Sequence, residues 1–235
     1  MYLAGFESLL RESQDRVIAN RSTKGEAREI ADAFVADLLR TCPVIDCVAV
    51  SGSVASGGYV PGDDIDFDLF VRDGAKYLTY ALFLLLGLRV ALRHRRGTQI
   101  RKVVCVNVIW TRGQVRPFVR TDESLAFELL HCDPVYGAPY FIDTIEKNPW
   151  IGTFFPQITS RPISDRTTPE PNRVGRLVAW VANHRRILRL AEGFGRVASF
   201  IVYTTAHWLR RNDLSAMQRL EFLRRVKYPY EFFQD

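Results

Sequence analysis

The sequence predicts an α/β (α+β) fold, with a small mixed-sheet core followed by a mainly helical C-terminal half. Strand and helix patterns alternate up to Arg112, and the patterns beyond it have helical spacing. We therefore expect a core with an N-terminal helix at 1–112 and a helical region at 113–235. A chain of 235 residues is long enough for such a core with a helical appendage.

The core elements are expected in the order helix, strand, glycine-rich turn, strand, helix, strand. The helices are placed at 24–41 and 75–92, and the strands at 44–50, 64–71 and 102–110. Pro43 ends the first helix. The apolar stretch at 77–88 is shorter than the about 20 residues that span a bilayer. It predicts a helix buried under the sheet, and no membrane span.

The C-terminal half is expected to contain a proline-rich loop at 153–171 and helices at 122–131, 173–190, 197–211 and 216–226. Asp133-Pro134 should end the first of these helices, because proline disfavours helical backbone in the residue before it. Basic and aromatic residues interleave within 173–211. That mixture is found in proteins that bind single-stranded nucleic acid and equally in helical bundles with one apolar face. The bundle is the preferred interpretation.

Composition limits the functional classes only weakly. The net charge of +6 and the pI of about 9.3 favour an anionic partner, such as a nucleotide, a nucleic acid or an acidic lipid. The cysteines form no C-x-x-C pair and have no histidine at ligand spacing, which predicts reduced thiols and no zinc site. The N-terminus lacks a signal-peptide pattern, so a cytoplasmic location is expected.

The segment 51–71 carries the strongest functional signal. Asp64, Asp66 and Asp68 alternate with apolar residues, so a strand places all of them on one face. Carboxylates this close oppose one another's ionisation, and a divalent cation would neutralise them. Mg²⁺ is typically held by one or two carboxylates together with substrate phosphates. Asp64 and Asp66 are therefore predicted Mg²⁺ ligands, and Asp68 is a further candidate.

Gly52 and Ser53 follow directly after a predicted strand. A small turn at this point lets backbone amides and a hydroxyl approach a triphosphate closely. The segment is not a P-loop, because the lysine of that motif is absent. Taken alone, the Gly52-Ser53 segment would fit a flexible turn, and the three aspartates would fit an exposed acidic edge strand. At this spacing, the two together favour phosphoryl chemistry.

These residues resemble the signature of the polymerase-beta-like nucleotidyltransferase superfamily. The signature is a hydrophobic residue, Gly-Ser or Gly-Gly, a gap of about ten residues and Asp-hydrophobic-Asp-hydrophobic. Gly52-Ser53 and Asp64-Ile65-Asp66-Phe67 match it in type and spacing, and the likeness covers roughly 24–112. The resemblance implies a nucleotidyltransferase core that uses two Mg²⁺ ions. Such a core transfers a nucleoside monophosphate from a nucleoside triphosphate to an acceptor and releases pyrophosphate.

The wider sequence is also similar to a group of poorly characterised bacterial nucleotidyltransferase-like proteins. The matching positions are 52–57, 63–66, Cys105-Val106-Asn107, Glu128, Asn148-Pro149-Trp150 and Phe155-Pro156. This second likeness identifies no acceptor, which stays open between a small molecule, a protein and RNA.

The resemblance also implies a third carboxylate on a later strand, and here the matching position holds Asn107. An amide oxygen can ligate Mg²⁺ but has no charge and cannot act as a base. Three outcomes are open: Asp68 supplies the charge, Glu128 reaches in from the following helix, or the site binds nucleotide without rapid turnover.

Basic residues crowd the stretch 89–120, which contains no acidic residue. They fit either a triphosphate-binding surface or a solvated helix end. Arg95, Arg96 and Lys102 are kept as nucleotide-binding candidates. The alternative functions are a catalytically weak or inactive nucleotide- or RNA-binding protein on the same core, and an interaction partner in a toxin or defence system.

Overall fold

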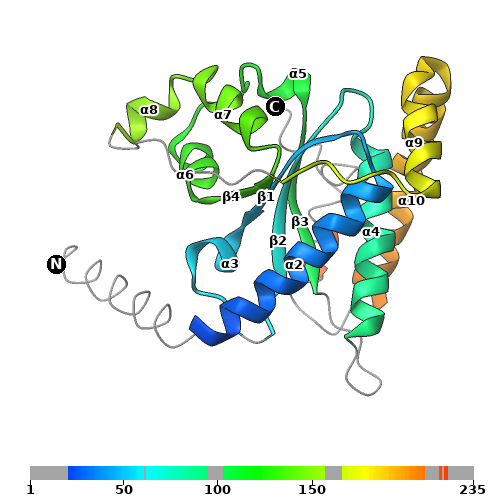
Figure 1. Cartoon of the computed structure of the whole chain (residues 1–235), viewed down its shortest axis with the longest axis horizontal. Coiled ribbons are helices and arrows are strands. Elements are labelled where there is room, and N and C mark those ends of the chain that lie inside the picture. Colours follow the sequence, from blue (N-terminus) through cyan, green and yellow to red (C-terminus); the bar gives the residue numbers. More distant parts are fainter. Residues whose placement is uncertain are drawn as a thin grey trace.

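A computed structural model describes residues 21–60, 62–94, 103–156 and 166–209, together with 217, 218, 220 and 221. Helices lie on both faces of a four-stranded mixed sheet (Figure 1). The order of the strands is β3-β2-β1-β4. They span Ile45–Ser51 (β1), Ile65–Val71 (β2), Val104–Thr111 (β3) and Asp133–Tyr136 (β4). The predicted α/β (α+β) fold class is confirmed.

Both parallel and antiparallel pairing occur in this sheet. Strand β1 is antiparallel to β2 and to β4, whereas β2 and β3 are parallel. Helix α4 (Lys76–Arg93) provides the crossover that parallel neighbours require. The fourth strand was not predicted: Asp133-Pro134 ends helix α6 (Glu123–His131) as expected, but it also begins β4. Proline is tolerated there because β4 is an edge strand, and the sheet therefore extends beyond Arg112.

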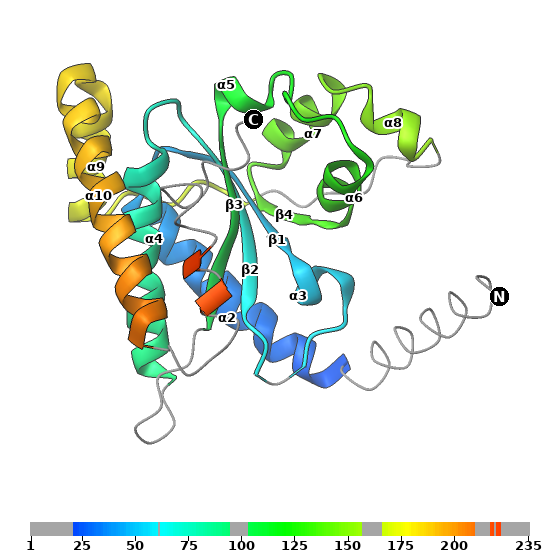
Figure 2. The ribbon, with the colours of Figure 1, turned by 180° about the vertical axis from the view of Figure 1, so that it is seen from behind.

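One face of the sheet is covered by α2 (Arg21–Thr41) and α4 (Figure 2). Phe34, Phe67 and Phe83 meet between these layers, with ring centroids 4.8 to 5.9 Å apart. The apolar stretch in α4 thus buries part of its surface against the sheet, as predicted. None of the helices in the described parts of the chain is long and apolar enough to span a membrane.

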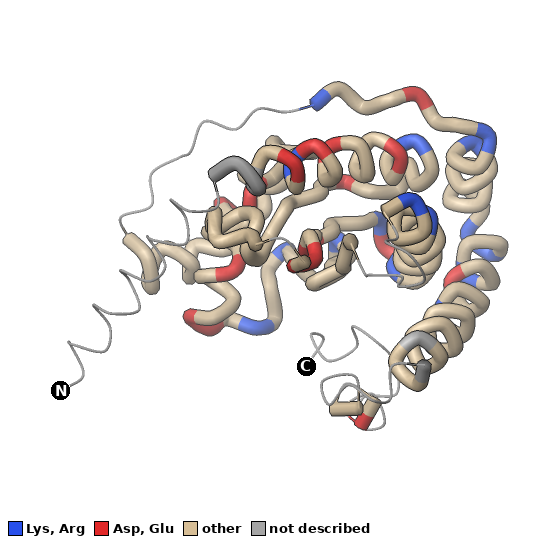
Figure 3. The backbone as a smooth tube through the Cα atoms, turned by 90° about the horizontal axis from the view of Figure 1, so that it is seen from below, with Lys and Arg blue, Asp and Glu red and all other residues tan. Residues whose placement is uncertain are grey.

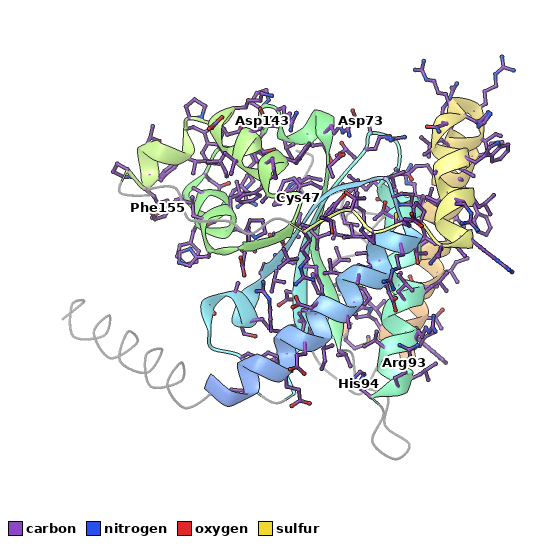
Figure 4. The ribbon with its side chains drawn as sticks, viewed as in Figure 1. Cys47, Asp73, Arg93, His94, Asp143 and Phe155 are labelled. Carbon is purple, nitrogen blue, oxygen red and sulfur yellow. The ribbon has the colours of Figure 1, made fainter. Side chains whose placement is uncertain are left out.

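A second apolar cluster lies on the opposite face, under α6, α7 (Ala138–Glu146) and α8 (Ile151–Phe154). The short helix α3 (Gly52–Ser56) packs Val54 into the first cluster, whereas the short helix α5 (Arg112–Val115) contributes Val115 to this second cluster. Cys47 lies within this cluster, near the centre of the molecule (Figure 4). The cluster also contains Phe70 and Trp110, so it covers the part of this face toward the C-terminal ends of β2 and β3.

Asn148 joins the elements around this second cluster. Its side chain is fully buried. Its Oδ1 accepts hydrogen bonds from the Phe118 amide (2.9 Å) and the Trp150 indole (3.0 Å). Its Nδ2 donates to the carbonyls of Val115 and Thr144, both at 2.8 Å. The full use of its hydrogen-bonding capacity explains the Asn148-Pro149-Trp150 motif as a structural feature.

The C-terminal helices differ from those expected. The break falls at His184, between α9 (Arg173–Asn183) and α10 (Arg185–Leu209), whereas the sequence predicted one between Leu190 and Val197. Most of the expected helix at 216–226 lies outside the described residues, as does 157–165 of the expected loop. From Val197 to Leu209, α10 carries no Lys, Arg, Asp or Glu (Figure 3).

Helix α10 continues through Gly193 and Gly195 because it packs against the start of α4. Glu192 accepts hydrogen bonds from the Tyr77 and Leu78 amides, at 2.8 and 2.9 Å. A carboxylate is favourable at a helix N-terminus, where backbone amides lack helical partners. A Cβ on Gly195 would lie 2.9 Å from the Tyr77 carbonyl carbon and oxygen. This glycine therefore permits close helix packing and does not end the helix.

Replacing each glycine of α10 by alanine separates packing from helix propensity. Gly195→Ala should lower the free energy of unfolding by about 1–3 kcal/mol, because the added methyl meets α4 backbone. Gly193→Ala is the matched control: nothing lies within 4 Å of its added Cβ. It should raise stability by about 0.5–1 kcal/mol. Urea denaturation measures both, and equal effects would contradict the close packing of α10 on α4.

Candidate functional site

At the polar end of the sheet, apolar residues and aspartates alternate along β2. Ile65, Phe67 and Leu69 are fully buried in the first cluster. The aspartates face the other way, with Asp64 and Asp66 half-buried and Asp68 fully buried. The predicted one-sided arrangement of the acidic residues is confirmed.

Cys105 belongs to this face and was missed in the sequence. Asp66 pairs with Cys105 of β3 on one side and with Ser51 of β1 on the other. One ligand atom from each of Asp64, Asp66 and Cys105 lies within 4.8 Å of the others. The sequence pattern predicts only a reduced thiol at Cys105. The available signal was its position on a strand beside the acidic one, two residues before Asn107.

A β-bulge places Asn107 beside Asp68. In the parallel pairing, Phe67 is opposite Val106 and Asp68 is opposite Val108, so Asn107 is the extra residue. Val106 packs in the first apolar cluster and Val108 in the second. Two consecutive residues, Asn107 and Val108, therefore turn toward the acidic face.

The Asn107 amide connects two carboxyl groups. Its Nδ2 lies 3.0 Å from Asp68 Oδ1 and 2.7 Å from Glu128 Oε1. Glu128 thus reaches in from α6, one of the outcomes left open by the sequence. Through these two hydrogen bonds, the Asn107 amide holds the carboxyl groups of Asp68 and Glu128 in place.

Asp68 is the most perturbed of these carboxyl groups. Ser51 Oγ donates to Asp68 Oδ1 at 3.1 Å, while Oδ2 is buried and has no hydrogen-bond partner among the described residues. Burial, and after it the charges of Glu128 and Asp66, raise the pKa of Asp68 to about 8, against the hydrogen bonds from Asn107 and Ser51. Asp68 is therefore mostly protonated at neutral pH, and it does not replace the charge that Asn107 lacks.

The turn after β1 approaches Asp66 closely. Gly52 has φ +61°, and a Cβ at this position would lie 2.4 Å from Asp66 Oδ2. Glycine is required here both by the positive φ and by the contact. Ser53 follows in α3 and is half-buried. The structure thus brings the predicted Gly52-Ser53 turn next to one of the two predicted metal ligands.

The predicted basic surface divides into two parts. Arg95, Arg96 and Lys102 lie outside the described residues. Farther along, Arg112 pairs with Asp46 at 2.5 Å, Arg116 with Asp143 at 2.8 Å, and Arg120 with Asp122. Arg116 also lies over the Tyr140 ring, 4.1 Å from its centroid. These three arginines form ion pairs with aspartates outside the acidic face of β2.

The raised pKa of Asp68 predicts a pH-dependent stability. Between the ordinary pKa of an aspartate, about 3.9, and about 8, the folded protein retains a proton that the unfolded chain has lost. The free energy of unfolding should therefore fall as pH rises through this window. Asp68→Asn preserves the acceptor for Asn107 and Ser51 but cannot ionise. Between pH 5 and pH 8, it should lose at least about 1 kcal/mol less stability than the parent.

Urea denaturation across this pH range measures the difference. Asp37→Asn on α2 is the control, since Asp37 has a 45% exposed side chain. The control should follow the parent. If the free energy of unfolding fell equally with pH in Asp68→Asn and in the parent, the buried, protonated state of Asp68 would be contradicted.

Comparisons with protein-family models, with curated proteins and with solved structures find no match to this chain. The geometry and chemistry of the acidic face are therefore the basis for a functional proposal.

Proposed function

We propose that the protein is a divalent-cation-dependent nucleotidyltransferase. The acceptor would attack the α-phosphorus of a nucleoside triphosphate, a new bond to the acceptor oxygen or nitrogen would form, and the bond to the bridging oxygen would break, releasing pyrophosphate. The observation that carries the proposal is the convergence of Asp64 and Asp66 beside the Gly52 turn. Carboxylates next to a tight glycine turn are the parts that phosphoryl transfer requires.

The two carboxylates fit a divalent cation. Asp64 and Asp66 offer half-buried carboxylate oxygens on one strand face, and Mg²⁺ is held in this way together with substrate phosphates. When bound, the expected pair of Mg²⁺ ions would supply charge neutralisation for the triphosphate and the leaving pyrophosphate. The tight approach of Gly52 to Asp66 would seat the phosphates directly against these carboxylates.

Glu128 is the residue that we assign to the acceptor side. Asn107 fixes its carboxylate by the 2.7 Å hydrogen bond, so Glu128 is oriented on the acidic face without belonging to the Asp64–Asp66 group. A carboxylate held in this way can accept the proton that the acceptor loses during attack. Neither the Gly52-Ser53 turn nor the aspartates of β2 identify the acceptor, which stays open between a small molecule, a protein and RNA.

A binding protein without turnover is the second candidate. It is favoured by one observation: Cys105, not a third carboxylate, stands beside Asp64 and Asp66. Such a protein would bind a nucleotide or RNA with the same turn and carboxylates. It would release no pyrophosphate with any acceptor.

Pyrophosphate release from each of the four nucleoside triphosphates, with a cell extract as the acceptor pool, tests the proposal. Release should depend on a divalent cation and fall about 100-fold or more in Asp66→Asn, which removes a charged ligand. Asp37→Asn removes one carboxylate from α2 and should release pyrophosphate as the parent does. Unchanged release in Asp66→Asn would refute the assignment, and nucleotide binding without release would select the second candidate.

A further inference from the structure

We propose that Cys105 is a third ligand of the cation held by Asp64 and Asp66, and that the site therefore prefers Zn²⁺ or Co²⁺ to Mg²⁺. This inference narrows the cation of the proposed function and rests on it for the role of the two carboxylates. It assigns a metal-binding task to a thiol that the sequence pattern had left without one.

The strand register brings these ligands together. Asp64 and Asp66 project from the same face of β2, and Cys105 is directly opposite Asp66 on the parallel neighbour β3. Their ligand atoms all lie within 4.8 Å of one another. Around a tetrahedral zinc ion, at about 2.1 Å for oxygen and 2.3 Å for sulfur, two ligand atoms are about 3.4–3.6 Å apart. Side-chain rotations of about 1 Å therefore close the three atoms around one ion.

A further observation points to a ligand at this place. Asp68 Oδ2, on the same strand face two residues from Asp66, is fully buried and has no hydrogen-bond partner in the described part of the chain. Burying an unsatisfied polar atom is costly, so such an atom two residues from Asp66 on the same strand face indicates a missing polar species. At Gly52, any side chain would collide with Asp66 Oδ2, so the backbone of the turn lies directly against that oxygen.

The chemistry of the donors decides the class of cation. Mg²⁺ takes oxygen ligands, whereas thiolates favour softer ions such as zinc. Two carboxylates and one thiolate leave the fourth position of a tetrahedral zinc or cobalt ion open, as in catalytic zinc sites. A phosphate oxygen or a water would complete it. The thiol proton passes to solvent when the sulfur ligates the ion.

The other cysteines are placed differently. Cys42, Cys47 and Cys132 are all buried in the apolar clusters, and Cys105 is half-buried at the polar end of the sheet. Burial raises the pKa of the Cys42 thiol to about 11, which opposes ligation there. Cys105 is accordingly the thiol that combines access with neighbouring carboxylates.

Cobalt titration followed by absorbance tests the proposal without relying on activity. A thiolate bound to Co²⁺ gives a near-ultraviolet charge-transfer band, which carboxylate ligands do not produce. The parent should show this band, and Cys105→Ser should lose it while circular dichroism reports an intact fold. Cys47→Ala is the matched control, because it removes a thiol from the same face of the sheet, on β1. That variant should retain the band.

Competition between cations provides the second readout. The parent should bind Zn²⁺ and Co²⁺ at least about tenfold more tightly than Mg²⁺, and Cys105→Asp should reverse the preference by supplying a third carboxylate. Cobalt bound without the band, or Mg²⁺ bound as tightly as Zn²⁺, would overturn the role of Cys105. If Mg²⁺-dependent pyrophosphate release then continued unchanged in Cys105→Ser, the proposed nucleotidyl transfer would hold without a role for Cys105. If the protein bound no cation at all, both the nucleotidyl transfer and the role of Cys105 would be refuted.

Discussion

The crowding of carboxyl groups on one face of β2, with Asp68 fully buried among them, is the constraint around which this end of the molecule is organised. Burial, and after it the charges of Glu128 and Asp66, raise the pKa of Asp68, which keeps its proton near neutral pH. The Asn107 amide is placed between Asp68 and Glu128, where it donates to both. Asp64 and Asp66 lie beyond that amide bridge, half-buried and close together. A cation bound by Asp64 and Asp66 would neutralise the repulsion between these two carboxylates, which the hydrogen bonds from Asn107 leave in place.

The rest of the fold supplies a rigid frame for this arrangement. Fully buried apolar residues fill one face of β2, so the aspartates cannot exchange faces without exposing Phe67 and Leu69. On the acidic face, the second cluster extends to Ala49 and Val108, which lie opposite Asp68 on the neighbouring strands. Glu128 of α6 contacts the bulge through Asn107. The crossover helix α4 is in turn held by α10, through the hydrogen bond from the Tyr77 amide to Glu192 and the close packing of Gly195 on Tyr77. Residues far apart in the chain thus fix one small polar region.

Much of this architecture can be predicted from the sequence, and the exceptions have physical causes. Strict alternation in 64–71 predicts both the strand and the face of its aspartates, because a one-residue slip would bury charge. The bulge at Asn107 could not be predicted, since Val106 and Val108 are equally suited to either face. The fourth strand was hidden by Pro134, which usually interrupts strands but is tolerated on an edge. The metal-ligand candidacy of Cys105 could not be predicted, because the carboxylates near it belong to another strand. Cysteine and histidine spacing along the sequence does not reveal such neighbours.

Anomalous diffraction from crystals grown with Zn²⁺, and separately with Mn²⁺ as a scatterer in place of Mg²⁺, tests the central claim most directly. The account predicts an anomalous peak within bonding distance of both Asp64 and Asp66, at about 2.0–2.2 Å for zinc to oxygen. The peak should vanish in crystals of Asp66→Asn while the strand register of β1, β2 and β3 is unchanged. No peak on this face in either metal, or a peak that persists in Asp66→Asn, would contradict a metal centre at the acidic end of the sheet.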